Sequence, residues 1–238
     1  MERIREAYER YDFHVVYHTL VNLCATTLSA VYLDVLKDRL YASAAGSPER
    51  RSAQTAMHRI ARTIATAAAP VMVFTADEVW TALPGKKEDS VHVAGFEDLE
   101  ESLVARVPAE AWMRLMSLRE EAAAILEEAR RHKTIGSSLE GAIALTESAA
   151  LEEDRAVTGT DGTGLADLFI VSETVEGAGL ESDADGGGWT ESKAYPGLRL
   201  AFRKARGRRC DRCWKVTPEA EDRGLCERCR RVVGGRAA

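Results

Sequence analysis

Apolar residues recur at steps of three and four over residues 2–83, which is the period of an amphipathic helix. One stripe begins after Asp12, a residue suited to an N-cap, and consists of Phe13, Val16, Leu20, Leu23, Cys24 and Thr27. A second helix is expected from about Ser29, with Tyr32, Leu36 and Leu40 on one face. Because Cys24 belongs to the first stripe, we expect it to be a core thiol and not a ligand.

Capping signals mark two further helices in this part of the chain. Ser47-Pro48-Glu49 offers an N-cap followed by proline in the first turn, so a helix is expected from there to Pro70. Thr75-Ala-Asp-Glu78 reads as a capping box and predicts a short helix that stops at Pro84-Gly85. Four such helices would bury one core.

A long helix is expected over residues 108–131, and its inner face would consist of Trp112, Leu115, Leu118, Ala122, Ile125 and Ala129. The cations Arg130-Arg-His-Lys133 stand where the negative end of the helix dipole favours them, before Gly136 breaks the helix. Contact with phosphate is the alternative role for these cations.

The residues that follow favour a small mixed domain. Gly141–Thr146 reads as a strand, Leu165–Ser172 as a short helix running into a buried strand, and Leu198–Arg203 as an edge strand, which together give a three-stranded sheet. Two segments between them, 158–164 and 181–188, have the composition of loops.

Charge divides the last third of the chain sharply. Residues 146–192 carry 12 acidic side chains and 1 basic one, whereas residues 193–238 carry 14 basic and 5 acidic ones. The basic tail therefore predicts a polyanion as partner, although a merely solvated tail is the alternative.

Four of the five cysteines form two Cys-x-x-Cys hooks, Cys210 with Cys213 and Cys226 with Cys229. Two such hooks separated by a short loop are typical of a tetrahedral zinc site made of four cysteines. Four protein thiolates leave no open position, so one structural Zn²⁺ is expected. Another thiolate-bound metal or two disulfides are the alternatives, and the polar residues at the start, Met1–Glu6, do not read as the apolar signal region that would accompany disulfides.

Trp214 directly follows the first hook and has arginines on either side. It could stack on an unpaired base, or it could equally pack against the zinc loop.

The sequence gives little evidence of catalytic groups. His14 and His18 lie four residues apart on one helix face, but no third ligand is evident. The sequence contains no glycine-rich phosphate loop and no nucleophile elbow, and we expect no apolar run to be long enough to span a bilayer. A soluble protein is predicted.

Several longer motifs resemble the C-terminal part of bacterial isoleucyl-tRNA synthetases, which are class Ia aminoacyl-tRNA synthetases. These motifs are Tyr11–His18, Leu28–Tyr41, Arg50–Thr55, Ala69–Trp80 and Lys133–Glu140. The two hooks are similar to that family's terminal zinc module, and the likeness covers essentially the whole chain.

The resemblance implies a part that binds the anticodon stem-loop of tRNA-Ile. Lys37, Arg39, Arg50 and Arg51 would meet phosphates of the stem, Arg208, Arg209 and Arg212 the loop backbone, and Trp214 a splayed base. For each of the first four, solvated surface and ion pairs within the bundle are the alternative role.

The family's activation and editing sites lie in other domains, so ATP belongs only to the full-length enzyme and this chain by itself is predicted to be inactive. Met1 would then begin a fragment of a longer chain or replace an internal residue. The remaining expectations are a monomer in the cytoplasm without membrane contact, and a catalytic domain that is in cis or missing. A stand-alone zinc-ribbon module that binds tRNA or another partner without anticodon specificity is the alternative.

The expected architecture is mainly α. An antiparallel helical bundle of the class Ia anticodon-binding type occupies residues 1–100, a long helix with a small α+β domain follows over 101–204, and a basic four-cysteine zinc ribbon occupies 205–238.

Overall fold

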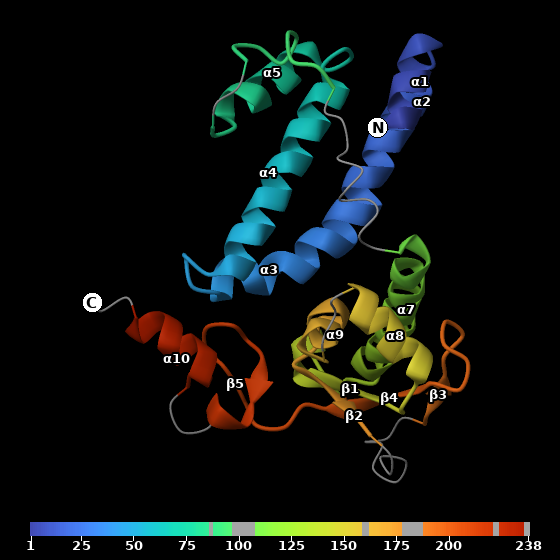
Figure 1. Cartoon of the computed structure of the whole chain (residues 1–238). Coiled ribbons are helices and arrows are strands. Elements are labelled where there is room, and N and C mark those ends of the chain that lie inside the picture. Colours follow the sequence, from blue (N-terminus) through green and yellow to red (C-terminus); the bar gives the residue numbers. More distant parts are fainter. Residues whose placement is uncertain (86–87, 97–107, 159–161, 178–187, 221–223, 236–238) are drawn as a thin grey trace. The chain divides into compact units, whose positions relative to one another are not determined.

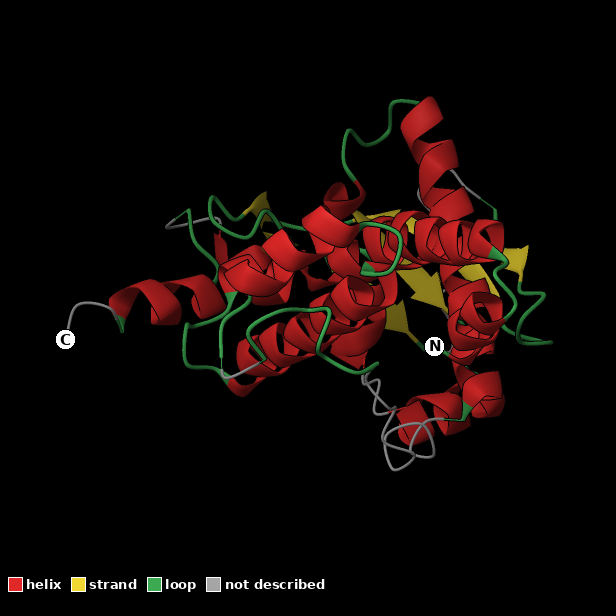
Figure 2. Ribbon diagram, turned by 90° about the horizontal axis from the view of Figure 1, so that it is seen from above, coloured by secondary structure: helices red, strands yellow, loops and turns green. Residues whose placement is uncertain are grey.

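The computed structural model describes residues 1–85, 88–96, 108–158, 162–177, 188–220 and 224–235. The chain divides into two compact units, Met1–Glu100 and Glu101–Ala238. Helices make up most of the described chain (Figure 2), in agreement with the predicted mainly α class.

The first unit is helical throughout its described elements. These are α1 (Glu2–Glu9), α2 (Phe13–Asn22), the π-helical η1 (Leu23–Tyr32), α3 (Leu33–Ala42), α4 (Pro48–Ala68) and α5 (Val73–Ala82). Helix α1 packs on α2, and α4 packs on both α3 and α5. The predicted cap of α4 is confirmed, because the Ser47 hydroxyl oxygen accepts a hydrogen bond from the backbone N–H of Arg50 at 3.3 Å.

Two predicted helix boundaries in this unit are wrong. No break occurs near Ser29, because α2, η1 and α3 follow one another without interruption over Phe13–Ala42. That segment contains neither proline nor glycine, so nothing local terminates it. Helix α5 begins at Val73, with Met72 at its N-cap position, so Thr75 lies inside the helix and does not cap it.

Alanine supplies much of the core of the first unit. One buried cluster contains Ala65, Ala69, Ala76, Trp80 and Val91, and another contains Ile4, Ala7, Val16 and Ala67. No residue of η1 is buried. The expected role of Cys24 is therefore wrong for this unit, since its thiol is exposed.

The helix over Phe13–Ala42 also corrects the expectation about membranes. By length and composition alone it is long and apolar enough to cross one, and only 6% of its apolar window is buried. A single helix of this kind is weak evidence, because core helices and signal sequences near an N-terminus meet the same criterion.

The second unit places helices against a small sheet. Helices α7 (Ala109–Arg131), α8 (Ala149–Thr158) and α9 (Gly162–Phe169) gather over the strands, as Figure 1 shows. The sheet has the order β2-β1-β4-β3, and its strands are β1 (Gly141–Leu145), β2 (Glu173–Glu176), β3 (Thr190–Glu191) and β4 (Arg199–Lys204). Strand β1 runs parallel to β2 and antiparallel to β4, with Ile143 opposite Phe202.

The predicted strand over Gly141–Thr146 is confirmed as β1, but the sheet has four strands and not the expected three, and the neighbours of β1 differ from expectation. Strand β4 is an interior strand paired on both sides, so its edge assignment is wrong. The segment predicted to run from helix into strand contains α9 followed by a turn at Ile170, whose φ is 58°, and β2 begins only at Glu173. Of the two expected loops, 158–164 lies partly in α8 and α9, and 181–187 lies outside the described residues.

The predicted span of helix α7 is correct to within one residue. Leu115, Leu118, Ala122 and Ala129 of the expected inner face are buried, but Trp112 is exposed and Ile125 only half-buried. The helix ends because Lys133 adopts a left-handed conformation with φ 58°, before Gly136 is reached. Arg130, Arg131 and His132 pair with Glu127 or Glu128 of the same helix.

A small hairpin and a final helix complete the unit. Strands β5 (Arg208–Arg209) and β6 (Val216–Thr217) pair antiparallel, the short 3-10 turn η4 (Pro218–Ala220) follows, and α10 spans Glu227–Gly234. A further 3-10 turn, η2 (Ser138–Glu140), precedes β1. The two cysteine hooks therefore lie at the ends of defined elements.

Candidate metal centre and nucleic-acid interface

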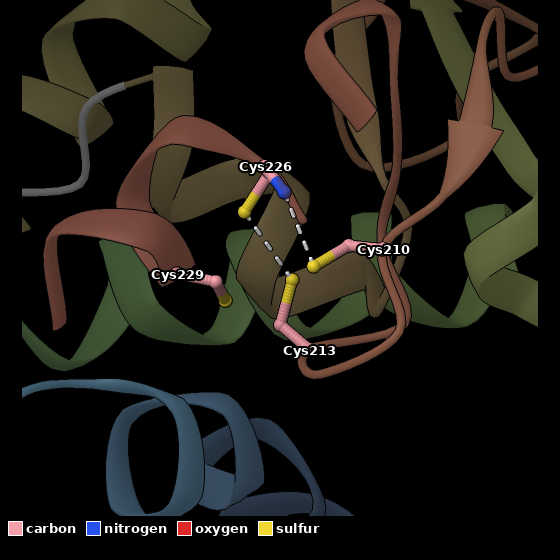
Figure 3. A group of neighbouring side chains, drawn as sticks. All are labelled: Cys210, Cys213, Cys226 and Cys229. Carbon is pink, nitrogen blue, oxygen red and sulfur yellow. Dashed lines mark hydrogen bonds between the residues drawn. The ribbon is translucent and has the colours of Figure 1, made fainter. Parts of the chain in front are cut away.

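The hairpin and the final helix bring the four cysteines together. Cys210 and Cys213 lie in the loop between β5 and β6, Cys226 immediately precedes α10, and Cys229 is in its first turn. Figure 3 shows the four side chains gathered in one small region. All four Sγ atoms lie within 4.8 Å of one another, so together they could hold one metal ion.

The cluster is sheltered from solvent. Cys210, Cys226 and Cys229 are buried, and Cys213 is half-buried, with Ala220 and Leu225 packed beside them. The backbone N–H of Cys226 donates to the Sγ of Cys210 at 3.3 Å. Such amide donors stabilise a sulfur in its charged form.

The environment separates the pKa values of the four thiols. Burial raises the pKa of Cys213, Cys226 and Cys229. Burial also acts on Cys210, but hydrogen bonds from the backbone N–H groups of Cys213, Cys226 and Arg212 prevail and lower its pKa to about 6. A bound cation would favour the thiolate form of all four, because metal coordination deprotonates a thiol.

Two glycines let the loops of this region approach closely. Gly207 has φ +110°, and a Cβ there would lie 2.4 Å from the carbonyl group of Thr217 across the hairpin. Gly224 has φ +70°, and a Cβ there would lie 2.5 Å from Oδ2 of Asp211. The backbone N–H of Asp211 donates to the Gly224 carbonyl at 2.8 Å, which joins the two hooks.

Trp214 projects from the first hook. Its backbone has φ +67°, a left-handed conformation that is a genuine outlier for a bulky residue, and its side chain is 61% exposed. The backbone N–H donates to the Cys210 carbonyl at 2.9 Å, which fixes the turn. Most of the side chain is therefore accessible from solvent.

The predicted arginines of this region fall into two groups. Arg208 and Arg209 are exposed on β5. Arg212 is half-buried, and its Nη1 donates to the Sγ of Cys229 at 3.5 Å. Arg212 thus contacts the cysteine cluster itself, whereas the β5 pair faces solvent.

The other predicted cations belong to the first unit. Lys37 and Arg39 are in α3, and Arg50 and Arg51 are in the first turn of α4, so the turn between these helices brings the two pairs to one region. Lys37 pairs with Asp34 at 2.5 Å, which raises the pKa of the ammonium. Arg50 Nη1 donates to the Ser43 carbonyl at 3.4 Å, while Arg51 is exposed.

Lys215 was not among the candidate site residues, although the sequence places it in the basic tail. Its Nζ lies 2.7 Å from Oδ1 of Asp167 in α9, and both side chains are largely buried. A separation of 48 positions hides such a pair from any pattern in the sequence.

Residues 1–146 match the family model described as the anticodon-binding domain of tRNA ligase, and the chain belongs to that family. The similarity to isoleucyl-tRNA synthetases inferred from the motifs is likewise confirmed by individual relatives, all named isoleucine–tRNA ligase. The relative from Syntrophotalea carbinolica is 39% identical over 98% of this chain. Those from Nitratidesulfovibrio vulgaris strain DP4 and Moorella thermoacetica are 41% and 37% identical over 100% and 97% of it.

Each of these matches covers 25% of the relative. The chain thus spans about a quarter of the length of these synthetases.

Proposed function

We propose that the chain is the part of an isoleucine–tRNA ligase that binds the anticodon stem-loop of tRNA-Ile. The observation that carries the proposal is the exposed Trp214, held in a left-handed turn beside four clustered cysteines and next to the exposed Arg208 and Arg209. Aromatic side chains that stack on unpaired bases and cations that contact phosphates are what recognition of a single-stranded loop requires.

One structural Zn²⁺ fits the four cysteines. A tetrahedral site with Zn–S bonds of about 2.3 Å has sulfur–sulfur edges of about 3.8 Å. The Sγ atoms of Cys213 and Cys226 are 3.8 Å apart, and no pair in the cluster exceeds 4.8 Å. Zinc would cross-link the β5–β6 loop to α10 and supply no reaction chemistry, since all four positions are protein thiolates.

The predicted cations would have two different roles in binding. Arg208, Arg209, Lys37, Arg39 and Arg51 would contact phosphates, which supplies salt-sensitive affinity. Arg50 and Arg212 would act mainly through the structure, Arg50 at the turn between α3 and α4 and Arg212 at the metal centre. Stacking by Trp214 on a splayed base would contribute to affinity. Hydrogen bonds from residues near Trp214 to the base edges of the anticodon would supply specificity.

The organisation proposed is an antiparallel bundle over residues 1–100, an α+β part over 101–204 and a zinc ribbon over 205–238. The ribbon is supported by the short β5–β6 hairpin that carries the first hook. The bundle is supported by the packing of α1 on α2, of α4 on α3 and of α5 on α4 in the first unit.

The ATP and amino-acid sites would lie in the part of the synthetase that this chain does not span, joined to it in cis and working in the cytoplasm. The helix over Phe13–Ala42 supports this arrangement. Its residues 13–33 carry no Asp, Glu, Lys or Arg, and Phe13, Tyr17, Val21 and Leu33 are exposed. Exposed apolar residues of this kind would be covered by a protein partner, and the remaining three quarters of the relatives' length would supply it.

Filter binding of the whole chain to tRNA-Ile, with and without zinc, tests the proposal. Zinc is removed with a zinc-selective chelator while Mg²⁺ is held constant, so that the tRNA stays folded. We expect at least a tenfold loss of affinity without zinc and its recovery when zinc is added back. Equal affinity in both states would show that the cysteine module does not take part in binding.

A further inference from the structure

The segment that carries the first hook is fastened to the α+β part by a nearly buried ion pair. Lys215, two residues after Cys213, extends its Nζ to within 2.7 Å of Oδ1 of Asp167. The two side chains are 13% and 11% exposed. A pair removed from water in this way is geometrically demanding, unlike the exposed ion pairs elsewhere on the chain, which are worth little.

A second contact fastens the next residue. The backbone N–H of Val216 donates to the Oγ of Ser172 at 2.7 Å. The Ser172 hydroxyl in turn donates to the Leu139 carbonyl, and its backbone N–H donates to the Gly141 carbonyl at 3.1 Å. Ser172 is thereby fixed at the start of β1, so the hook is tied to the sheet and to α9 at once.

The same residues shape the hook itself. The Lys215 carbonyl accepts a hydrogen bond from the backbone N–H of Cys210 at 2.9 Å, and this bond closes the loop that contains Cys213 and Trp214. Lys215 therefore joins two parts of the structure, because its carbonyl binds the metal-binding loop and its ammonium binds Asp167 in α9. A shift of Lys215 would move the loop.

We propose that Lys215 and Asp167, with Ser172, are positioning residues that fix the direction in which the metal-binding loop presents Trp214. The idea rests on the proposed function in so far as Trp214 contacts RNA. On this account the four-cysteine module is not a ribbon on a free tether, because the α+β part sets its orientation. None of the three residues needs to touch the RNA, and none needs to ligate the metal.

The test follows the Val216 amide by NMR hydrogen exchange in the zinc-loaded full chain. Lys215→Met, Asp167→Asn and Ser172→Ala each remove one contact, and the double exchange Asp167→Lys with Lys215→Asp restores the ion pair in reverse. Arg131→Met is the matched control, because it breaks a pair with Glu128 whose side chains are 68% and 64% exposed. Zinc content and helical circular dichroism are measured for every variant.

We expect the Val216 amide to exchange at least tenfold faster in each single variant, with zinc content unchanged and the control like wild type. The reversed pair should recover much of the protection that Lys215→Met loses. Unchanged exchange in all three single variants would overturn the proposal. If a single variant fails to fold, the reversed pair decides, since a folded protein with wild-type exchange supports the positioning role and fast exchange contradicts it.

A second readout separates this inference from the proposed function. In Lys215→Met, affinity for tRNA-Ile should fall about tenfold with zinc still bound. If exchange rises but affinity does not change, the orientation of the loop is irrelevant to RNA and the inference fails, whereas anticodon preference in the wild-type chain is a separate measurement that can still succeed.

Discussion

The guanidinium of Arg212 donates from Nη1 to the Sγ of Cys229 at 3.5 Å. Burial raises the pKa of that thiol, and the hydrogen bond from Arg212 opposes the rise. An arginine predicted from the sequence to contact the RNA backbone thus lies against one of the four clustered cysteines.

This geometry separates Arg212 from its neighbour Arg209. Removing an outer contact to a metal ligand typically lowers metal affinity ten- to a hundredfold, so Arg212→Met should bind zinc about tenfold more weakly. Arg209→Met removes an exposed cation and should leave zinc affinity unchanged. Competition with a chromophoric chelator measures both, and equal zinc affinities in the two variants would refute the assignment.

Trp214 should contribute to tRNA affinity by stacking, without contributing to the salt dependence of that affinity. Stacking on one base is worth about 1–3 kcal/mol, so Trp214→Ala should weaken tRNA binding by about ten- to a hundredfold and leave the slope against log salt unchanged. Arg209→Met should instead lower that slope by about 1. Filter binding over a salt series distinguishes the two, and an unaltered affinity in Trp214→Ala would remove the stacking role.

Asp154 should make the second unit sensitive to acid. Hydrogen bonds from Arg114, at 2.7 and 2.6 Å, lower the pKa of this carboxyl together with a bond from the Tyr195 hydroxyl at 2.8 Å, while burial opposes them. A carboxylate whose folded pKa is depressed stabilises the fold above its unfolded pKa of about 4 and loses that contribution as the pH falls through the folded value. Stability should therefore decline below about pH 4.

Asp154→Ala should remove this part of the pH dependence. It should also lower the free energy of unfolding at pH 7 by about 2 kcal/mol, because the buried Tyr195 hydroxyl would lose its acceptor. Urea unfolding followed by near-ultraviolet circular dichroism at pH 7 and at a pH about one unit below the unfolded pKa provides the comparison. Glu153→Ala, the exposed neighbour, is the control, and the same loss in both variants would contradict the role given to Asp154.

Cys226→Ser should release zinc, weaken tRNA binding and leave most of the helical signal in circular dichroism, because α10, the helix that carries Cys229, has only 8 residues. Cys24→Ser serves as control, since that thiol is exposed and far along the chain from both hooks. Retention of one zinc per chain in Cys226→Ser would mean that this residue is not a ligand. Loss of the helical signal would show that the module and the bundle are not separate.

The sequence predicted the parts of the fold that depend on residues close together along the chain. Ser47 with Pro48 fixes where α4 begins, and the apolar period of α7 fixes its span. The cysteine cluster was likewise predictable, because two Cys-x-x-Cys turns can hardly bind one metal unless they face each other.

The sequence did not predict the features that depend on how residues far apart along the chain pack together. Strand β4 alternates apolar and basic residues as an edge strand would, yet β3 pairs with its second edge and makes it an interior strand. Cys24 follows an apolar stripe, but none of the residues of η1 is buried. The pairing of Lys215 with Asp167 joins residues that only the folded sheet brings together.

Exchange of the anticodon is the measurement that tests the central claim most directly. Zinc-loaded chain is titrated with tRNA-Ile and with the same tRNA whose anticodon alone is replaced by an unrelated one, at one fixed salt concentration. We predict at least tenfold tighter binding of tRNA-Ile. Equal affinity for the two would contradict anticodon recognition and leave a tRNA-binding module that does not read identity.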